Sequence, residues 1–481
     1  MRRLALFAPV AALLLSGCID LAPAYHRPAA PTPASFPAGP AYAAPPITAQ
    51  PVVGWRDFFS DPKLKTVIER ALAENRDLRV AVANIAEARA QYHVQRAALF
   101  PTISAQAGAT LGQEPASVVS GGATPGVKGA FDEHIYSLTA GTSAFEVDLF
   151  GKIRDLTHAQ QDRYFATQQA RDAAQISLVS EVAADYLAIG ADRALLGIAQ
   201  DTLKSGTASL TVTQQRFGVG VDSGLDVSQA QTVVQQARFD VARLTTQVAQ
   251  DRNALDLVVG APVGDELLPT NAGEPIVVLE RLPAAISSAV LLARPDVLEA
   301  EDQLRAANTN IGAARAAFFP NIELTGSGGL TSLALSALFQ GASGTWAFAP
   351  AITQTLFDAG ANRGNLELAK AQRDAGVAAY EKAIQTAFRE VADALAQRGT
   401  IDEQLSAQEA LTSANGDALK LSTARYEHGS DTYLNVLIAQ RSYYAGRQTL
   451  VASELAEADN LVTLYTALGG GLSTSPAPAG P

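Results

Sequence analysis

The sequence predicts a mainly α-helical chain with a smaller β part that enters a membrane, built by internal duplication. Long proline-free stretches favour long helices, and short alternating segments favour strands. The pattern Arg, aromatic, two residues, Gly, four residues, Leu-x-Val occurs at 216–227 and recurs 209 residues later at 425–436. RAALFP at 96–101 is echoed by RAAFFP at 315–320. A repeat of about 200 residues is far longer than a solenoid unit, so we interpret the chain as two copies of one large unit.

The N-terminus is typical of a bacterial lipoprotein. A basic start precedes an apolar segment, Leu4–Leu15, that is too short to span a bilayer. Leu15-Ser16-Gly17-Cys18 resembles the lipobox, so Cys18, the only cysteine, is the predicted lipid attachment site. Ile19 rather than Asp after that cysteine indicates outer-membrane sorting. An ordinary secretory signal with an incidental cysteine is the alternative.

The predicted domains follow the duplication. We expect a signal peptide at 1–17, a lipidated Pro- and Ala-rich tether at 18–52, a first repeat at 53–262, a linker at 263–283, a second repeat at 284–470 and a disordered tail at 471–481. Each repeat begins with a helix, at about 62–99 and about 284–318, and each helix ends at Phe-Pro.

Two short strands follow the first helix of each repeat. Residues 102–111 and 345–354 alternate between an apolar and a polar face over about ten residues, which fits a strand. Residues 135–149 and 321–333 are weaker candidates. The intervening segments, 112–131 and 334–344, are rich in Gly, Ser and Ala and are predicted loops.

A very long helical stretch completes each repeat. No proline occurs between Pro125 and Pro262, or between Pro350 and Pro476. An amphipathic seam with 3-4-3 spacing runs along 152–217; its apolar members are Ile176, Val179, Ala183 and Tyr186. The repeated glycine motif interrupts each stretch once, which predicts two helical hairpins.

Four predicted strands cannot close a barrel by themselves. A bilayer strand needs about 9–11 residues, and open sheet edges are not tolerated in lipid. If these strands enter a membrane, the chain must therefore oligomerise, and three copies would supply twelve strands. A soluble sheet that caps a helical bundle is the alternative from the strands alone.

Composition and motifs argue against catalysis and nucleic-acid binding. The net charge is −12, which disfavours a nucleic-acid surface. Ser327 and Ser343 do not lie in a nucleophile elbow, and the five histidines lack metal-ligand spacing. We therefore expect no enzyme activity, no cofactor and no metal site.

The ordered motifs resemble the TolC/OprM-like outer-membrane factors of tripartite efflux pumps, in the NodT-like lipoprotein branch. The resemblance covers nearly all of 18–470. Besides the repeated glycine motif and the two Phe-Pro sequences, it rests on GWRDFFSDPKLKTVIERAL (54–72), FEVDLFGKIR (145–154), LARPDV (292–297) and LFDAGANR (356–363).

The resemblance implies a homotrimer in the outer membrane of a Gram-negative bacterium. A twelve-stranded β-barrel with four strands per chain would continue into a periplasmic twelve-helix α-barrel. The lumen would conduct small molecules passively from a periplasmic adaptor and an inner-membrane transporter, most typically of the RND type. The same fold serving metal-ion efflux or type I protein secretion is an alternative, although a single methionine argues against soft metals. A lipid-anchored coiled-coil scaffold without a pore is another.

The resemblance also places the glycine motif at the periplasmic hairpin tips, where the adaptor docks. Gly220 and Gly429 are expected to adopt the positive φ that ends a helix, with Asp222 and Asp431 at the start of the next helix. The predicted adaptor contacts are Arg216, Val219, Gly220, Val221, Arg425, His428, Gly429 and Ser430. A turn that only closes the hairpin explains much of the same chemistry.

The periplasmic gate is expected just after the tips. Related channels carry acidic residues there, but the second repeat has Asn435 and Ile438, and only Asp226 in the first repeat is acidic. A ring of Leu434, Ile438 and Tyr433 is therefore a second candidate for the constriction. Packing of Leu434 and Ile438 between helices is the alternative.

Overall fold

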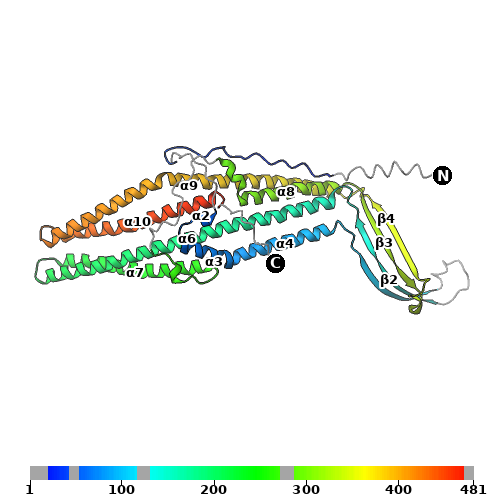
Figure 1. The fold of residues 1–481 in the computed structure, drawn as a ribbon, viewed down its shortest axis with the longest axis horizontal. Coiled ribbons are helices and arrows are strands. Elements are labelled where there is room, and N and C mark those ends of the chain that lie inside the picture. The colour runs from blue at the N-terminus through cyan, green and yellow to red at the C-terminus, as the bar shows by residue number, and fades with distance from the viewer. Residues whose placement is uncertain (1–19, 43–53, 116–129, 271–286, 471–481) are drawn as a thin grey trace. The chain divides into compact units, whose positions relative to one another are not determined.

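The computed structural model describes residues 20–42, 54–115, 130–270 and 287–470, and the chain forms two compact units. Unit 1 comprises 1–27, 86–165 and 301–378, and unit 2 comprises 28–85, 166–300 and 379–481. In chain order the elements are α2 (Trp55–Phe58), α3 (Pro62–Glu74), α4 (Arg76–Ala97), β1 (Ser104–Pro115), β2 (Ala130–Glu146), α6 (Lys152–Gly218), α7 (Gly224–Val259), η1 (Asp265–Leu267), η2 (Ser288–Ala293), α8 (Pro295–Ala316), β3 (Asn321–Ser332), η3 (Leu335–Ala337), β4 (Gly344–Thr353), α9 (Ala361–Glu427) and α10 (Tyr433–Ala467) (Figure 1).

Unit 1 contains an antiparallel sheet with strand order β1-β2-β3-β4. The middle pair, β2 and β3, joins the two repeats, with Leu138 opposite Leu330. A bulge near Ala144, whose φ is 54°, shifts the register between Thr142 and Phe145. All four predicted strands are confirmed, although β1 and β2 extend into the predicted loop at 112–131, because residues 112–115 and 130–131 continue their ladder.

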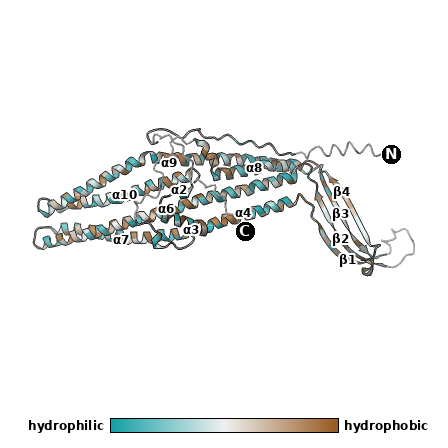
Figure 2. Ribbon diagram, viewed as in Figure 1, coloured by the Kyte–Doolittle hydropathy of each residue, from teal (hydrophilic) through white to brown (hydrophobic). Residues whose placement is uncertain are grey.

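Unit 2 contains most of the two helical hairpins, α6–α7 and α9–α10, with α6 from residue 166 onward and α9 from residue 379 onward. The predicted seam is confirmed, since Val179, Ala183 and Tyr186 are at most 1% exposed. Tyr186 also donates a 2.7 Å hydrogen bond to Asp61, whose side chain caps α3. The described helices carry hydrophilic residues along their whole length (Figure 2), and none of them has a stretch long and apolar enough to cross a membrane.

The first helix of each repeat is broken, contrary to the single helices predicted at 62–99 and 284–318. Asn75 leaves the helix and separates α3 from α4, and its side chain accepts a 2.7 Å hydrogen bond from the Leu78 amide. Arg294 separates η2 from α8, because a residue before proline avoids the helical region. Both helices end two residues earlier than predicted, at Ala97 and Ala316.

The two breaks make equivalent contacts in unit 2. The Asn75 amide donates a 2.7 Å hydrogen bond to the carbonyl of Val258, and the Arg294 guanidinium donates one of 2.7 Å to the carbonyl of Ala467. Val258 and Ala467 are themselves 209 residues apart, at the C-terminal ends of α7 and α10. Each break therefore satisfies a carbonyl that the helix end leaves open.

The described parts of the predicted tether and of the predicted inter-repeat linker both pack against the rest of the chain. The described part of the tether, 20–42, is extended as its prolines require, but residues 21–27 are hydrogen-bonded to α8. Of the predicted linker, Val263 and Leu268 are 1% and 2% exposed and belong to the core of unit 2. Cys18, the signal peptide at 1–17 and the tail at 471–481 lie outside the described residues.

Candidate functional site

Both hairpins of unit 2 end in the same backbone motif. Gly220 and Gly429 have φ values of 80° and 74°, as the sequence predicts. The amide of Gly220 donates to the carbonyl of Phe217, and the amide of Val221 donates to that of Arg216, each over 2.9 Å. Gly429 and Ser430 repeat this pattern at the second tip. This pair of hydrogen bonds is a Schellman motif, which requires a left-handed residue and so explains the two glycines.

Each tip is closed by an ion pair across the turn. Arg216 lies 3.1 Å from Asp222, and Arg425 lies 3.2 Å from Asp431. The two aspartates therefore neutralise the arginine of the preceding helix, in addition to lying near the start of the next one. Hydrogen bonds from the Thr432 amide and the Asn435 side chain, together with Arg425, lower the pKa of Asp431.

The two tips differ in the aromatic residue after the arginine. In the second repeat it is Tyr426, which is 5% exposed and whose hydroxyl donates a hydrogen bond to Asp222 of the first tip. The Arg216 guanidinium lies 4.6 Å from the centre of the Tyr426 ring. In the first repeat it is Phe217, which is 51% exposed and has no hydroxyl. Asp222 thus joins the two hairpins. The equivalent contact from Phe217 to Asp431 cannot form, because Phe217 has no hydroxyl.

The helices after the tips start differently, a feature that the sequence analysis missed. Ser223 and Asp226 form a reciprocal capping box at the start of α7, and the Asp226 carboxylate accepts hydrogen bonds from the Ser223 amide and hydroxyl over 2.9 and 2.6 Å. Thr432 makes no side-chain cap at the start of α10. The spacing Ser-x-x-Asp is the signal that could have revealed the box.

The structure separates the gate candidates into three environments. Leu434 and Ile438 are 48% and 54% exposed, so they do not pack between the helices of this chain. Asp226 is held in its capping box, and the Asn435 amide donates a 2.6 Å hydrogen bond to Asp431.

Tyr433 does not fit the proposed constriction. Its side chain is 2% exposed, and its ring lies 5.4 Å from that of Tyr426 in a small core between the hairpins. Packing against the chain's own helices keeps the ring away from solvent, which corrects its inclusion in an apolar ring.

The predicted adaptor contacts form an exposed surface. Val219 and Val221 are 76% and 62% exposed, and Arg425, His428 and Ser430 are exposed as well. A Cβ atom added at Gly220 or Gly429 would meet no atom within 4 Å. The glycines are thus required by their backbone conformation and not by crowding within the chain. Arg216 is less accessible, because Asp222 and Tyr426 hold it.

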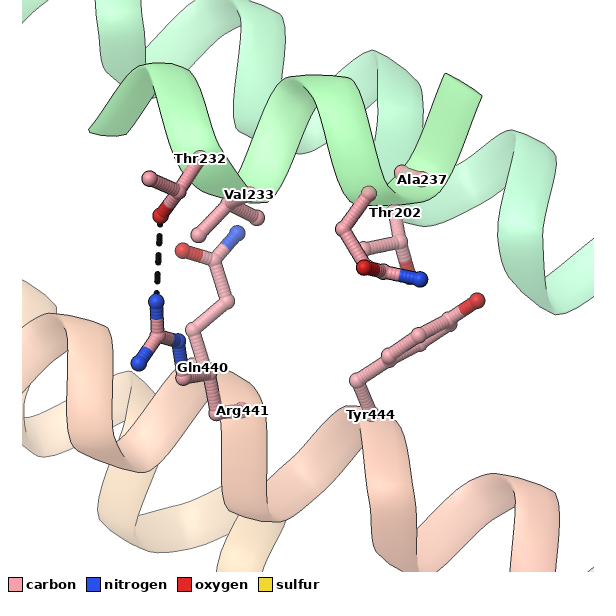
Figure 3. Close-up of a pocket in the computed structure, with 8 residues that line it drawn as sticks. Thr202, Thr232, Val233, Ala237, Gln440, Arg441 and Tyr444 are labelled. Carbon is pink, nitrogen blue, oxygen red and sulfur yellow. Dashed lines mark hydrogen bonds between the residues drawn. The ribbon is translucent and has the colours of Figure 1, made fainter. Parts of the chain in front are cut away.

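A pocket of about 260 Å³ lies between the hairpins, farther along the helices (Figure 3). It is lined by Thr202, Thr232, Val233, Gln236, Ala237, Gln440, Arg441 and Tyr444. Arg441 donates a 3.0 Å hydrogen bond to Thr232, and Tyr444 donates one of 3.0 Å to Asp240. Burial and Asp240 raise the pKa of Tyr444, so its hydroxyl remains a donor. These contacts form a polar seam between α7 and α10, and the lining has no nucleophile paired with a base.

The part of the chain that the structure describes holds no cluster of three side chains suited to a metal.

Comparisons with known proteins agree with this architecture. The model of the family described as "Outer membrane efflux protein" matches residues 67–261 and 286–470, one segment in each repeat. A probable efflux pump outer membrane protein, TtgC of Pseudomonas putida, is 43% identical over 470 residues, covering 96% of this chain and 94% of its own. Outer membrane protein OprJ of Pseudomonas aeruginosa is 39% identical over 465 residues, covering 96% and 95%.

Solved structures show the same fold. A membrane protein from Pseudomonas aeruginosa has a TM-score of 0.85 at 39% identity, covering 94% of this chain and 98% of its own. The open state of the MtrE outer membrane channel of Neisseria gonorrhoeae has a TM-score of 0.83 at 36% identity, with the same coverage. The chain therefore belongs to the outer membrane efflux protein family.

Proposed function

We propose that three copies of this chain form a closed channel through the outer membrane and the periplasm. The observation that carries the proposal is the open sheet of unit 1, whose edge strands β1 and β4 have no further partner among the described residues. All ten residues of β4 are exposed, including Trp346 and Phe348. An apolar sheet with open edges is unstable in lipid, so neighbouring copies must pair with it.

The stoichiometry follows from strand and helix numbers. Three copies of a four-stranded sheet supply twelve strands, enough for a closed barrel. The four long helices of each chain, α6, α7, α9 and α10, likewise supply twelve for a helical barrel. The lumen conducts passively, with no covalent chemistry.

The exposed hairpin tips are the docking surface for a periplasmic adaptor, which couples the channel to an inner-membrane transporter of the RND type. The tips offer Val219, Val221 and two glycines without neighbouring atoms, so a partner's backbone has room to approach. Acylation of Cys18 anchors each copy in the outer membrane.

Small apolar organic molecules are the proposed cargo. Relatives at 43% identity are named as toluene, solvent and antibiotic efflux pump proteins. Those names favour organic compounds over metal ions or secreted proteins as substrates here.

The mass of the purified assembly and its conductance together test the proposed channel. The purified full chain is expected to be a trimer by native mass spectrometry and to produce discrete current steps in planar bilayers. A gene deletion should lower the minimum inhibitory concentration of hydrophobic drugs and solvents. A monomer that carries no current would overturn the channel and favour the scaffold alternative, whereas sensitivity to metal salts alone would overturn the cargo.

A further inference from the structure

Residues 21–27 follow one face of α8. Contacts with this segment involve Glu301, Arg305, Asn308, Gly312 and Arg315 of the helix. Their spacing of four, three, four and three residues places all five on a single helix face. The segment runs antiparallel to the helix, from Arg27 at Glu301 to Leu21 at Arg315.

A buried carboxylate holds one end of the segment. The Glu301 side chain is 2% exposed, accepts a bidentate hydrogen bond from Arg27 and a 3.2 Å bond from Tyr25, and pairs with Arg305 at 2.7 Å. Burial raises the pKa of Glu301, but the hydrogen bonds and charges of Arg27 and Arg305 outweigh it and lower the pKa below the usual value. Two of the partners of this charged group therefore come from the N-terminal segment.

The rest of the face recognises the backbone of the segment. Asn308 donates a 2.8 Å hydrogen bond to the carbonyl of Pro23, and Arg315 donates one of 2.9 Å to that of Leu21. An extended, proline-containing chain presents unpaired carbonyls, and donors on a rigid helix satisfy them.

Gly312 permits the close approach. A Cβ atom at this position would lie 2.6 Å from the Ala22 amide nitrogen and would also collide with the Asp155 carboxylate. Alanine cannot be accommodated unless the segment moves away from the helix. Glycine at 312 is thus explained by the segment that lies across it.

We propose that this face of α8 is a docking site for the chain's own mature N-terminus, and that docking fixes the position of the membrane anchor. The positioning part rests on the proposed acylation of Cys18. A free tether of 35 residues would let the anchor range over roughly 30–35 Å. With Leu21 docked, Cys18 is only three residue steps from a residue held on the helix, a reach of about 10 Å. The docked end, Arg315, lies six residues before Asn321, where strand β3 begins, so the lipid is held at the level where the membrane strands start.

A nitroxide label at Ala24 tests the docking. Ala24 is exposed, and acylation blocks the thiol of Cys18, so Ala24→Cys is the only reactive thiol of the full mature chain. We expect an immobilised spectrum in the unaltered background. Gly312→Ala and Glu301→Gln should each produce a mobile component of more than half of the signal. Gly364→Ala, another helical glycine of unit 1 with no atom within 4 Å of its added Cβ, is the matched control and should leave the spectrum unchanged.

A second label tests the positioning. In the full mature chain prepared without acylation, Cys18 is the sole thiol and can carry the label itself. Restricted motion there, released by Gly312→Ala, supports a fixed anchor. Free motion at Cys18 while Ala24→Cys is immobilised would overturn the positioning, and free motion at both would overturn the docking.

Conductance measured on the same samples separates this proposal from the channel function. Current steps from a chain whose N-terminus is mobile would support the channel function and count against docking. Loss of current with an immobilised N-terminus leaves docking intact and counts against the channel.

Discussion

The hydroxyl of Tyr426 donates a hydrogen bond to the carboxylate of Asp222 and so ties the α9–α10 hairpin to the α6–α7 hairpin at their tips. Asp222 is at the same time the ion-pair partner of Arg216, and its side chain is only 7% exposed. Separation of the hairpins must therefore break a hydrogen bond to a largely buried charge.

Tyr426→Phe should make the tips separate more easily. A hydrogen bond to a charged group contributes about 1.5–3 kcal/mol, so we expect the open fraction of the channel to rise roughly tenfold or more. Single-channel recordings in planar bilayers measure this fraction. Tyr443→Phe is the control, because the Tyr443 hydroxyl makes no hydrogen bond within the described residues. Equal open fractions for both variants would show that the Tyr426 bond does not restrain the tips.

Substitutions at the tip glycines should separate backbone strain from partner contact. Gly220→Ala and Gly429→Ala force alanine into a left-handed conformation, at a cost of roughly 1–2 kcal/mol each, whereas asparagine tolerates this conformation better. We therefore expect the double Asn variant to form stable trimers and yet to lose drug efflux, because its side chains occupy the surface offered to the adaptor. Bulky residues at both glycines should have the same effect.

Drug susceptibility in a deletion strain and thermal unfolding of the purified trimer are the two measurements. Gly218→Asn is the matched control, since Gly218 lies in the same tip, in open space and without a positive φ. Normal resistance in the double Asn and bulky variants would contradict a role for the glycines in docking.

Ile438→Ala should increase single-channel conductance. Ile438 is 54% exposed in the chain, so the substitution should change the free energy of unfolding by less than about 0.5 kcal/mol while widening any ring that the three copies form. Leu421→Ala, at a side chain that is 65% exposed on α9 and was not predicted to line the gate, provides the comparison. If both variants conduct like the unaltered channel, Ile438 is not part of the constriction.

Docking of the N-terminal segment should weaken as pH rises toward about 7. Burial raises the pKa of Asp155 to about 7, and the nearby carboxylates of Asp20 and Asp148 add to the shift, whereas Arg154 opposes it. The Oδ2 atom of Asp155 has no hydrogen-bond partner among the described residues, so no donor there offsets the cost of ionising this buried carboxyl. On α8 the facing residue is Gly312, and Arg315, one turn farther along the same face, donates to the carbonyl of Leu21.

The sign follows from proton uptake. Asp20 belongs to the N-terminal segment, so the part of the shift that it causes is present only in the docked state. The docked state therefore holds more protons, and its advantage declines as pH rises toward 7. The label at Ala24→Cys should be immobilised at pH 5.5 and partly mobile at pH 8.5. Asp155→Asn keeps a hydrogen-bond donor without the charge and should stay immobilised at both values. A spectrum that does not change with pH in the unaltered background would contradict a role for the ionisation of Asp155 in docking.

Local rules accounted for the features that each repeat forms by itself. Phe-Pro ends the first helices to within two residues, alternating side chains identify the strands, and Gly220 and Gly429 adopt the predicted left-handed conformation, because all three depend on neighbouring residues alone. Pro295 also carried the signal for the helix break at Arg294. At Asn75 the break combines a local cap of the Leu78 amide with a hydrogen bond to the carbonyl of Val258, and the second contact lies too far along the chain for local rules to predict.

By itself, the sequence determined the duplication, the two hairpins and the four strands, since these follow from spacing and short-range sterics. The efflux family was indicated separately, by the resemblance of its ordered motifs. Only the tertiary structure decided that Tyr426 bridges the tips while Phe217 is exposed, that Tyr433 is buried, and that residues 21–27 lie against α8. Each of those outcomes depends on a partner more than 200 residues away or on packing between helices. The periodicity of a single segment carries no information about such a partner.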